Sequence, residues 1–262
     1  MFGASYTSRW LTAAVGLPVL AAAVWAGGWF LAVLVAAASV AGMREFFVML
    51  GRPGPVLETA GLVLGAAAVA TAVVGGWPAL VAVLTAALWL EQCGFLGRFA
   101  WRGQTAPPRA VVVAALLYIP VSLRFLCLFS VRETAFVLAV VMAADTGAYF
   151  AGHLVGGPKV WPAVSPGKTW AGTVGGLAAA ALVAAAFALF CAPGAWALAG
   201  AGVVLAAVSQ LGDFFESALK RASGVKDSGS LLPGHGGILD RIDGLLPAIL
   251  VFAAGRAALG LG

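Results

Sequence analysis

The sequence predicts an all-α integral membrane protein, a polytopic bundle of about nine transmembrane helices with a cytoplasmic N-terminus. Of its 262 residues, 62% are hydrophobic and only 10% are charged, whereas roughly 25% of the residues in a soluble domain are charged. So few charges cannot cover the surface of a soluble fold of this size, and the apolar excess requires lipid. Because a spanning helix takes about 20 residues, the length allows eight or nine spans with their loops.

The first four spans form a predicted N-terminal scaffold, residues 1–109. An uncharged run between positions 9 and 44 is interrupted at Gly27-Gly28 and predicts a helical hairpin. The stretch 58–91 repeats this arrangement with Gly75-Gly76-Trp77-Pro78 as its turn, because paired Gly and Pro end helices. We interpret the first apolar run as an uncleaved span rather than a signal peptide.

Five further spans follow in residues 110–262, which we interpret as the catalytic region. The polar pair Arg132-Glu133 and the turn Pro193-Gly194 separate neighbouring apolar runs. The five spans cover residues 110–130, 134–152, 173–191, 195–214 and 242–258. Two long polar loops, 153–172 and 220–241, connect them.

Basic residues divide unequally between the two sides of this bundle. With the N-terminus inside, the outer side holds only Arg132 and Arg256, and the inner side holds Arg9, Arg44, Arg52, Arg98, Arg102, Arg109, Lys159, Lys168, Lys220, Arg221 and Lys226. Cytoplasmic loops carry the excess of Lys and Arg, so both polar loops are expected in the cytoplasm. The net charge of +5 thus reflects orientation, and nucleic acid is not an expected partner.

Aspartate and lysine are confined to one part of the chain, since all five aspartates and all four lysines lie between Asp145 and Asp243. One side of the inner end of the eighth span carries four polar residues at helical spacing, namely Asp213, Ser217, Lys220 and Arg221. Asp240 and Asp243 are expected to face them from the start of the ninth span. Carboxylates that meet in this way suit Mg²⁺, which binds carboxylate oxygens together with substrate phosphates.

The loop between these helix ends carries groups that suit phosphates. Its cations are Lys220, Arg221 and Lys226, and the glycines expected to let the backbone approach phosphate oxygens are Gly224, Gly229, Gly234, Gly236 and Gly237. Carboxylates for a metal and cations for phosphates predict a nucleotide polyphosphate site. The alternative is that these acids and bases only pair with one another at the membrane surface.

Asp145 lies inside an otherwise apolar span, where a carboxylate is costly and is by default a functional candidate. The next loop contains Gly167-Lys168-Thr169, which lacks the first glycine of a P-loop and has no predicted strand before it, so we reject a P-loop ATPase. A second phosphate-contacting loop is favoured. The alternative is a helix-starting Ser-Pro turn with a solvated lysine.

Several other polar residues favour structural interpretations. Arg124 is expected to snorkel or to pair inside the bundle, and solvated charges at helix ends are expected for Arg44-Glu45, Glu58 and Glu91. The isolated cysteines are expected to be small buried hydrophobic residues.

Residues Ser217 through Asp243 resemble the C-terminal signature of the phosphatidate cytidylyltransferase family. The signature reads S-x-hydrophobe-K-R-x₄-K-D-x-small-x₂-hydrophobe-P-x-H-G-G-hydrophobe-x-D-R-hydrophobe-D, and every fixed position is present. Two weaker blocks agree, around Asp145 and around Ser165. The resemblance implies an enzyme of phospholipid biosynthesis that transfers CMP from CTP to phosphatidic acid, in a bacterial inner membrane with its active site facing the cytoplasm.

The resemblance also implies roles for individual residues. We expect Mg²⁺ on Asp213 and Asp240 with Asp243 close by, and leave open a second, monovalent cation. The remaining catalytic candidates are Lys220, Arg221, Lys226, Asp227 and His235. The expected substrate-binding residues are Asp145, Ser165, Lys168, Ser217 and Arg241. The expected partners are CTP, phosphatidic acid and the bilayer, with a homodimer left open.

Three other functions fit the sequence less well. A transporter would place its charges near the membrane midplane in repeated halves, whereas here they crowd one boundary. A CDP-alcohol phosphotransferase would need a D-G-x₂-A-R motif, but Leu-Leu-Pro follows Asp243-Gly244. Another CTP-dependent lipid nucleotidyltransferase is the nearest alternative.

Overall fold

The computed structural model describes residues 4–102, 110–190, 197–232, 234 and 236–256, without the side chains of residues 4–13 and 97–102. The chain forms two compact units. Unit 1 contains residues up to Leu128 together with the loop Ser228–Leu239, and unit 2 contains Phe129–Asp227 and the chain from Asp240 onward.

Four long helices open unit 1, and they are α1 (Ala4–Ala26), α2 (Gly28–Leu50), α3 (Pro55–Val74) and α4 (Gly76–Arg102). The predicted breaks at Gly27 and Gly75 are confirmed, and both Gly27 and Gly76 have positive φ values that favour glycine. Trp77 and Pro78 belong to the first turn of α4 rather than to the connection, because Pro is tolerated where an N–H has no helical partner.

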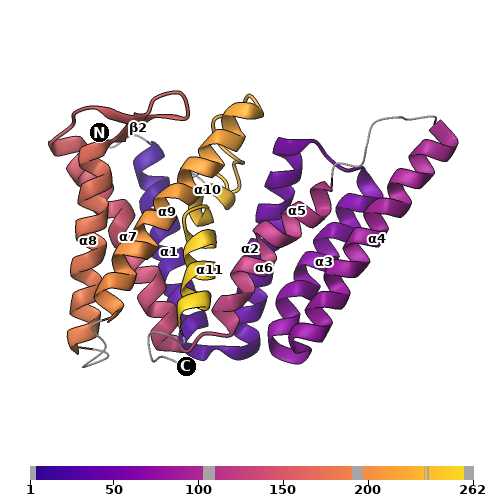
Figure 1. Cartoon of the computed structure of the whole chain (residues 1–262), viewed down its shortest axis with the longest axis horizontal. Coiled ribbons are helices and arrows are strands. Elements are labelled where there is room, and N and C mark those ends of the chain that lie inside the picture. The colour runs from indigo at the N-terminus through magenta and orange to yellow at the C-terminus, as the bar shows by residue number, and fades with distance from the viewer. Residues whose placement is uncertain (1–3, 103–109, 191–196, 233, 235, 257–262) are drawn as a thin grey trace. The chain divides into compact units, whose positions relative to one another are not determined.

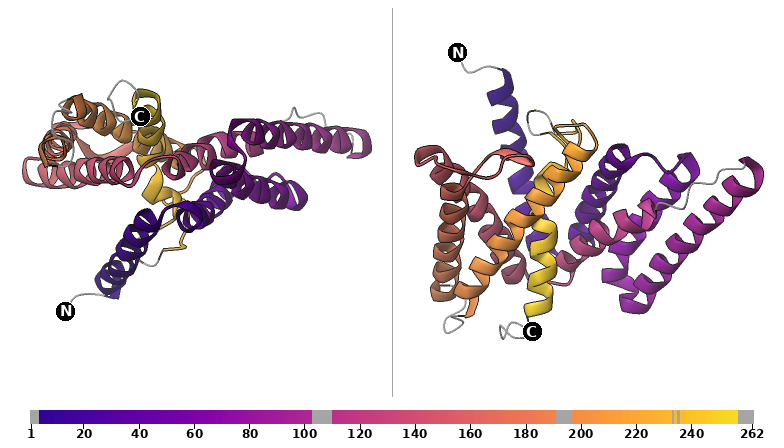
Figure 2. Two further views of the ribbon diagram at one scale, coloured as in Figure 1. Left: turned by 90° about the horizontal axis from the view of Figure 1, so that it is seen from below. Right: turned by 45° about the horizontal axis from the view of Figure 1, so that its top comes forward.

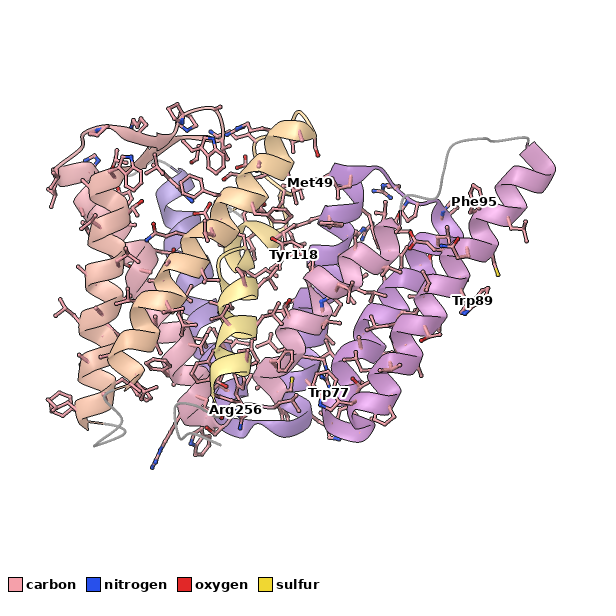
Figure 3. All side chains as sticks on the ribbon, in the orientation of Figure 1. Met49, Trp77, Trp89, Phe95, Tyr118 and Arg256 are labelled. Carbon is pink, nitrogen blue, oxygen red and sulfur yellow. The ribbon has the colours of Figure 1, made fainter. Side chains whose placement is uncertain are left out.

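The predicted fifth span is a broken segment rather than one helix. It consists of α5 (Val111–Tyr118), α6 (Pro120–Leu123) and the 3₁₀ turn η1 (Arg124–Cys127). Pro120 removes a donor from the helix interior and explains the break. Arg124 is almost fully buried with its guanidinium 5.0 Å from the ring centre of Trp77, which Figure 3 labels at the end of the α3–α4 hairpin. Snorkelling is therefore wrong for Arg124, and its contacts inside unit 1 are with the rings of Trp77 and Phe125.

Two glutamates that we expected to be solvated at helix ends are buried in unit 1. Glu91 is 6% exposed and accepts hydrogen bonds from the backbone N–H groups of Val112 and Val113, 2.9 and 3.2 Å long. It therefore satisfies donors at the start of α5 that the helix itself leaves unpaired. Glu45 on α2 is also buried. Both predictions were wrong because a carboxylate at a helix end can be covered by a segment distant in sequence.

Unit 2 is a group of helices with a small β-hairpin at one end. The long helices are α7 (Val131–Leu154), α8 (Trp170–Phe190) and α9 (Ala197–Ala222), followed by the single turn α10 (Leu239–Ile242) and by α11 (Leu245–Gly255). Strands β1 (Lys159–Trp161) and β2 (Ser165–Thr169) pair antiparallel between α7 and α8. The hairpin and the C-terminal end of α9 lie at the same end of this unit (Figures 1 and 2).

Small residues bring α7 and α8 into close contact. A side chain at Gly147 would collide with Ala179 and the Gly175 carbonyl, and one at Gly176 would collide with the Ala144 carbonyl. Such close approach is the usual basis of helix association in membranes. Asp145 lies on α7 between the residues that make these contacts, Ala144 and Gly147, and is itself exposed in unit 2.

Six described helices are long and apolar enough to cross a bilayer, namely α2, α3, α4, α7, α8 and α9. Shorter apolar helical segments occur at 14–26, 111–127 and 245–255. Large apolar side chains such as Phe30, Trp89 and Leu182 are exposed, and Trp89 points away from its helix (Figure 3). The protein is therefore an integral membrane protein and nearly all-α.

Two details differ from the prediction. The β1–β2 hairpin means that the fold is not strictly all-α. Cys93 is exposed and Cys127 half-buried, so neither is a fully buried small hydrophobe, because much of the exterior of this protein is itself apolar. Cys191 lies outside the described residues.

Candidate active site

The β1–β2 hairpin delivers a lysine to the inner end of α9. Lys168 Nζ lies 2.5 Å from Asp213 Oδ2 and 4.2 Å from the ring centre of Phe214. Trp161 on β1 also contacts Phe214, with ring centres 6.1 Å apart. The hairpin is thus anchored on α9 by aromatic packing and by one ion pair, and the structure brings together two of the predicted site residues.

Local hydrogen bonds explain why this segment forms a hairpin that leads directly into a helix. The Trp170 N–H donates to the Pro158 carbonyl, and Lys159 Nζ donates to the Gly167 carbonyl. Thr169 Oγ1 accepts from the Gly172 N–H at 3.1 Å, in the first turn of α8. Our prediction that no strand precedes Gly167 was wrong, since β1 precedes it and β2 contains it; the P-loop is still excluded by its missing first glycine.

A second lysine is enclosed between two carboxylates. Lys220 Nζ lies 2.6 Å from Asp240 Oδ1 and also pairs with Glu216 one turn earlier on α9. The three side chains are 12%, 7% and 0% exposed, in the order Lys220, Asp240 and Glu216. A buried charge is tolerated only when it is paired, so this cluster fixes α10 against the end of α9.

Glycines place Asp243 beside the same helix. A side chain at Gly212 would collide with the Asp243 carbonyl, and one at Gly244 would collide with Ser209 Oγ. Gly212 immediately precedes Asp213, whose Oδ1 accepts a 3.4 Å hydrogen bond from Ser217 Oγ. The carboxylates of Asp213 and Asp243 therefore belong to one small region of unit 2.

Asp145 completes this region from α7. It lies within electrostatic range of Asp213, Lys168 and Arg241. Arg241 is exposed on α10, next to Asp240 in the chain. Three helices and the hairpin thus contribute charged groups to one place, as the sequence predicted from spacing alone for α9 and the residues around 240.

Acidic groups outnumber basic groups in this region. Burial raises the pKa of the Asp243 carboxyl well above its usual range, and the negative charges of Asp213 and Glu216 raise it further. Such a cluster has the donor chemistry that a hard cation requires. Among the described residues no group of three acidic, His or Cys side chains is arranged to hold a metal ion by itself. A metal ion bound here would therefore need ligands from water or substrate as well.

Other predicted site residues lie apart from these ion pairs. Arg221 is exposed and donates to the Val225 carbonyl at 3.4 Å. Lys226 and Asp227 are exposed in the bend after α9, and Ser165 is half-buried at the start of β2. His235 lies outside the described residues.

The Gly-rich loop Ser228–Leu239 packs within unit 1 and corrects one expectation. Side chains at Gly229 and at Gly237 would collide with the carboxylate of Glu45. These two glycines therefore let the backbone approach a protein carboxylate rather than a phosphate. Gly224, Gly234 and Gly236 have positive φ values, and the Leu232 N–H donates to the Gly236 carbonyl across a tight turn.

A sequence model of the cytidylyltransferase family matches residues 7–258, which is nearly the whole chain. The chain belongs to the cytidylyltransferase family. This membership confirms the resemblance predicted from the Ser217–Asp243 signature. Five residues of the region described above lie in the signature of this cytidylyltransferase-family protein, namely Ser217, Lys220, Asp240, Arg241 and Asp243.

Three curated relatives of this family member carry the name phosphatidate cytidylyltransferase. The chain is 43% identical over 177 residues to the phosphatidate cytidylyltransferase of Brucella suis, covering 64% of this chain and 63% of the relative. It is 48% identical over 124 residues to that of Haemophilus influenzae (45% and 43% covered) and 47% identical over 109 residues to that of Staphylococcus aureus strain COL (41% and 42% covered). The chain thus spans less than two thirds of the length of these relatives.

Two residues of this cytidylyltransferase-family protein were missed from the sequence. Glu216 was inside the polar segment that drew attention, and its i,i+4 spacing to Lys220 was a usable signal. Glu45 gave no such signal, because its partners lie far along the chain, 183 residues away in the case of Ser228.

Proposed function

We propose that this protein transfers CMP from CTP to phosphatidic acid, forming CDP-diacylglycerol and pyrophosphate in phospholipid biosynthesis. The observation that carries the proposal is that two lysines, Lys168 and Lys220, are held by Asp213 and Asp240 inside one charged region of unit 2. Cations and carboxylates in one place match a substrate with several phosphates and a divalent ion. The names of the curated relatives support the same reaction.

The proposed chemistry is a displacement at phosphorus. A phosphate oxygen of the lipid forms a bond to the α-phosphorus of CTP, and the bond from that phosphorus to the oxygen bridging to the β-phosphorus breaks. Pyrophosphate leaves with the electron pair. The lipid phosphate is already ionised at neutral pH, so the protein needs to align the two phosphates and to neutralise charge rather than to remove a proton.

The residues act on phosphates through charge. Lys168 and Lys220 are preorganised by their carboxylate partners, and Arg221, Lys226 and Arg241 add exposed cations toward the leaving group. Asp213 and Asp240, with Asp243 close by, would hold Mg²⁺ together with substrate phosphates. The bound ion would neutralise charge on the phosphates.

The proposal also covers topology. We propose nine spans, which the three shorter apolar segments at 14–26, 111–127 and 245–255 would complete. The N-terminus and the charged region would then face the cytoplasm of a bacterial inner membrane, where CTP is available and where a lipid can present its headgroup while its chains stay in the bilayer. Cysteine accessibility at position 159 in intact and opened cells tests this orientation.

Double labelling tests the reaction. Purified protein in detergent is mixed with phosphatidic acid, Mg²⁺ and CTP labelled on either the α- or the γ-phosphate. The α-label is expected in the lipid fraction and the γ-label in pyrophosphate. Label from the γ-position in lipid would indicate a kinase, and no lipid label from folded protein with any lipid phosphate would reject the enzymatic proposal.

A further inference from the structure

Glu45 is a buried carboxylate in the last two turns of α2. It is 9% exposed, while the preceding residue, Arg44, is exposed. A carboxylate in a membrane-spanning helix is costly unless hydrogen-bond donors compensate it. The hydrogen-bond donors around Glu45 in unit 1 therefore indicate its role.

All three described hydrogen bonds of Glu45 come from the Gly-rich loop Ser228–Leu239. Oε2 accepts from Ser228 Oγ at 3.0 Å and from the Leu239 N–H at 2.8 Å, and Oε1 accepts from the Ile238 N–H at 3.0 Å. The donors stand at the two ends of the loop. The Glu45 side chain thus joins the two ends of the loop.

The loop is shaped for this carboxylate. Gly229 and Gly237 flank the donors, and a Cβ at either position would collide with Glu45. Ser228 is itself buried, 5% exposed. The two glycines and the buried hydroxyl of Ser228 thus surround a single carboxylate. Hydrogen bonds to a carboxylate are stronger than those between neutral groups.

The hydrogen bond to Leu239 links Glu45 to the charged residues at the start of α10. Leu239 is the first residue of α10, and its N–H would otherwise lack a helical partner. Asp240 is joined to Leu239 by one peptide bond, and its carboxylate pairs with Lys220. A loop that is free to shift at Leu239 carries Asp240 with it.

We propose that Glu45 is a positioning residue for the proposed nucleotidyl transfer. It holds the two ends of the Gly-rich loop Ser228–Leu239 together and thereby fixes the start of α10. It does not contact the reacting groups. The inference rests on the proposed function only for its effect on turnover, since the loop closure itself can be measured without substrate.

Hydrogen exchange of the full-length protein in detergent tests the closure. In Glu45→Gln, the amide group can no longer accept all three hydrogen bonds, so exchange at residues 236–240 should accelerate about ten- to a hundredfold, while the rest of α2 exchanges as in the wild type. Ser228→Ala removes one donor and should accelerate exchange less. Arg44→Ala, the adjacent exposed residue, is the matched control and should leave the loop unchanged.

Turnover separates positioning from simple stability. Glu45→Gln should lower kcat at least about tenfold, and the double variant Glu45→Gln/Ser228→Ala should lose little more than Glu45→Gln alone, because both act through one contact. Additive losses would indicate a general folding defect and overturn the proposal. So would unchanged exchange at residues 236–240 in Glu45→Gln, or accelerated exchange with full turnover.

These outcomes stay distinct from a failure of the proposed function. If the wild type transfers no CMP, the exchange measurements still confirm or reject the closure by Glu45. If Glu45→Gln does not fold, Ser228→Ala carries the same test with a smaller change, and no acceleration of exchange in that variant overturns the proposal.

Discussion

Lys168 on β2 and Asp213 on α9 form an ion pair in which Nζ and Oδ2 lie 2.5 Å apart, with the ammonium group above the ring of Phe214. The pair links the loop between α7 and α8 to the helix that carries the start of the family signature. An aromatic face on one side and a carboxylate on the other restrict the lysine to one position. A cation fixed in this way can meet a phosphate without a further loss of side-chain entropy.

Removing this cation should weaken catalysis. We expect Lys168→Ala to lower kcat/KM for CTP about 100-fold, because a preorganised charge that stabilises phosphates is lost. Initial rates at varied CTP concentrations measure the change. Lys159→Ala is the control from the same hairpin, since this exposed lysine donates to the Gly167 carbonyl. Equal losses in both variants would contradict a specific role for Lys168.

Neutralising Asp240 should abolish turnover. Asp240→Asn keeps the shape of the side chain but removes a charge that pairs with Lys220 and that is proposed to hold Mg²⁺. We expect a loss of at least about 100-fold in kcat with an unchanged elution profile in detergent. Activity near the wild-type value at saturating Mg²⁺ would remove Asp240 from the proposed metal site.

The buried lysine should matter for stability as well. Lys220→Met leaves Glu216 and Asp240 buried without their cation, so the free energy of unfolding should fall by about 3–5 kcal/mol. Adding Glu216→Gln should restore part of this stability but no activity. Thermal unfolding in detergent measures both variants, with Arg221→Ala as an exposed control that should change little; a stable Lys220→Met protein would show that the cluster is not held by charge.

The close contact between Gly212 on α9 and the Asp243 carbonyl predicts that a larger residue at position 212 lowers stability and activity. Gly212→Ala should destabilise the protein by about 1–3 kcal/mol and lower activity, since the added methyl group displaces the Asp243 backbone. Gly200 lies on the same helix in open space, so Gly200→Ala should be neutral or stabilise by up to about 1 kcal/mol. Similar unfolding temperatures for the two variants would contradict this close packing of α9 against Asp243.

Removing an exposed cation of the signature should lower kcat/KM more than removing an exposed cation of unit 1. Lys226→Ala is expected to lower kcat/KM about tenfold or more through lost attraction to phosphates. Arg44→Ala should have a small effect. Equal losses at equal protein yield would show that the charged groups of the two regions contribute alike.

Features with local causes were predictable from the sequence. The helix breaks at Gly27 and Gly75 follow from glycine itself, and the i,i+4 and i,i+7 spacing of α9 places Ser217 and Lys220 near Asp213 whatever the rest of the fold does. The broken fifth span had a local cause too, in Pro120, but its apolar surroundings favoured a continuous helix.

Features that depend on distant segments were not predictable. The β1–β2 hairpin is short and contains Pro166, a residue that normally argues against a strand, and it is held by the contact of Trp161 with a helix formed later in the chain. Glu91 and Glu45 have the same sequence context as solvated charges at helix ends. Only the segments that cover them, around Val112 and around Leu239, distinguish a buried carboxylate from a solvated one.

The hydrogen bonds of Glu45 also determine when unit 1 can complete its folding during translation. Glu45 is synthesised well before its partners, since Ser228 follows it by 183 residues and Leu239 by 194. Until then α2 contains a carboxylate without these donors. Unit 1 therefore reaches its final hydrogen bonding only after residue 239 has been translated, and a chain that stops at residue 227 would lack the donors to Glu45 on α2.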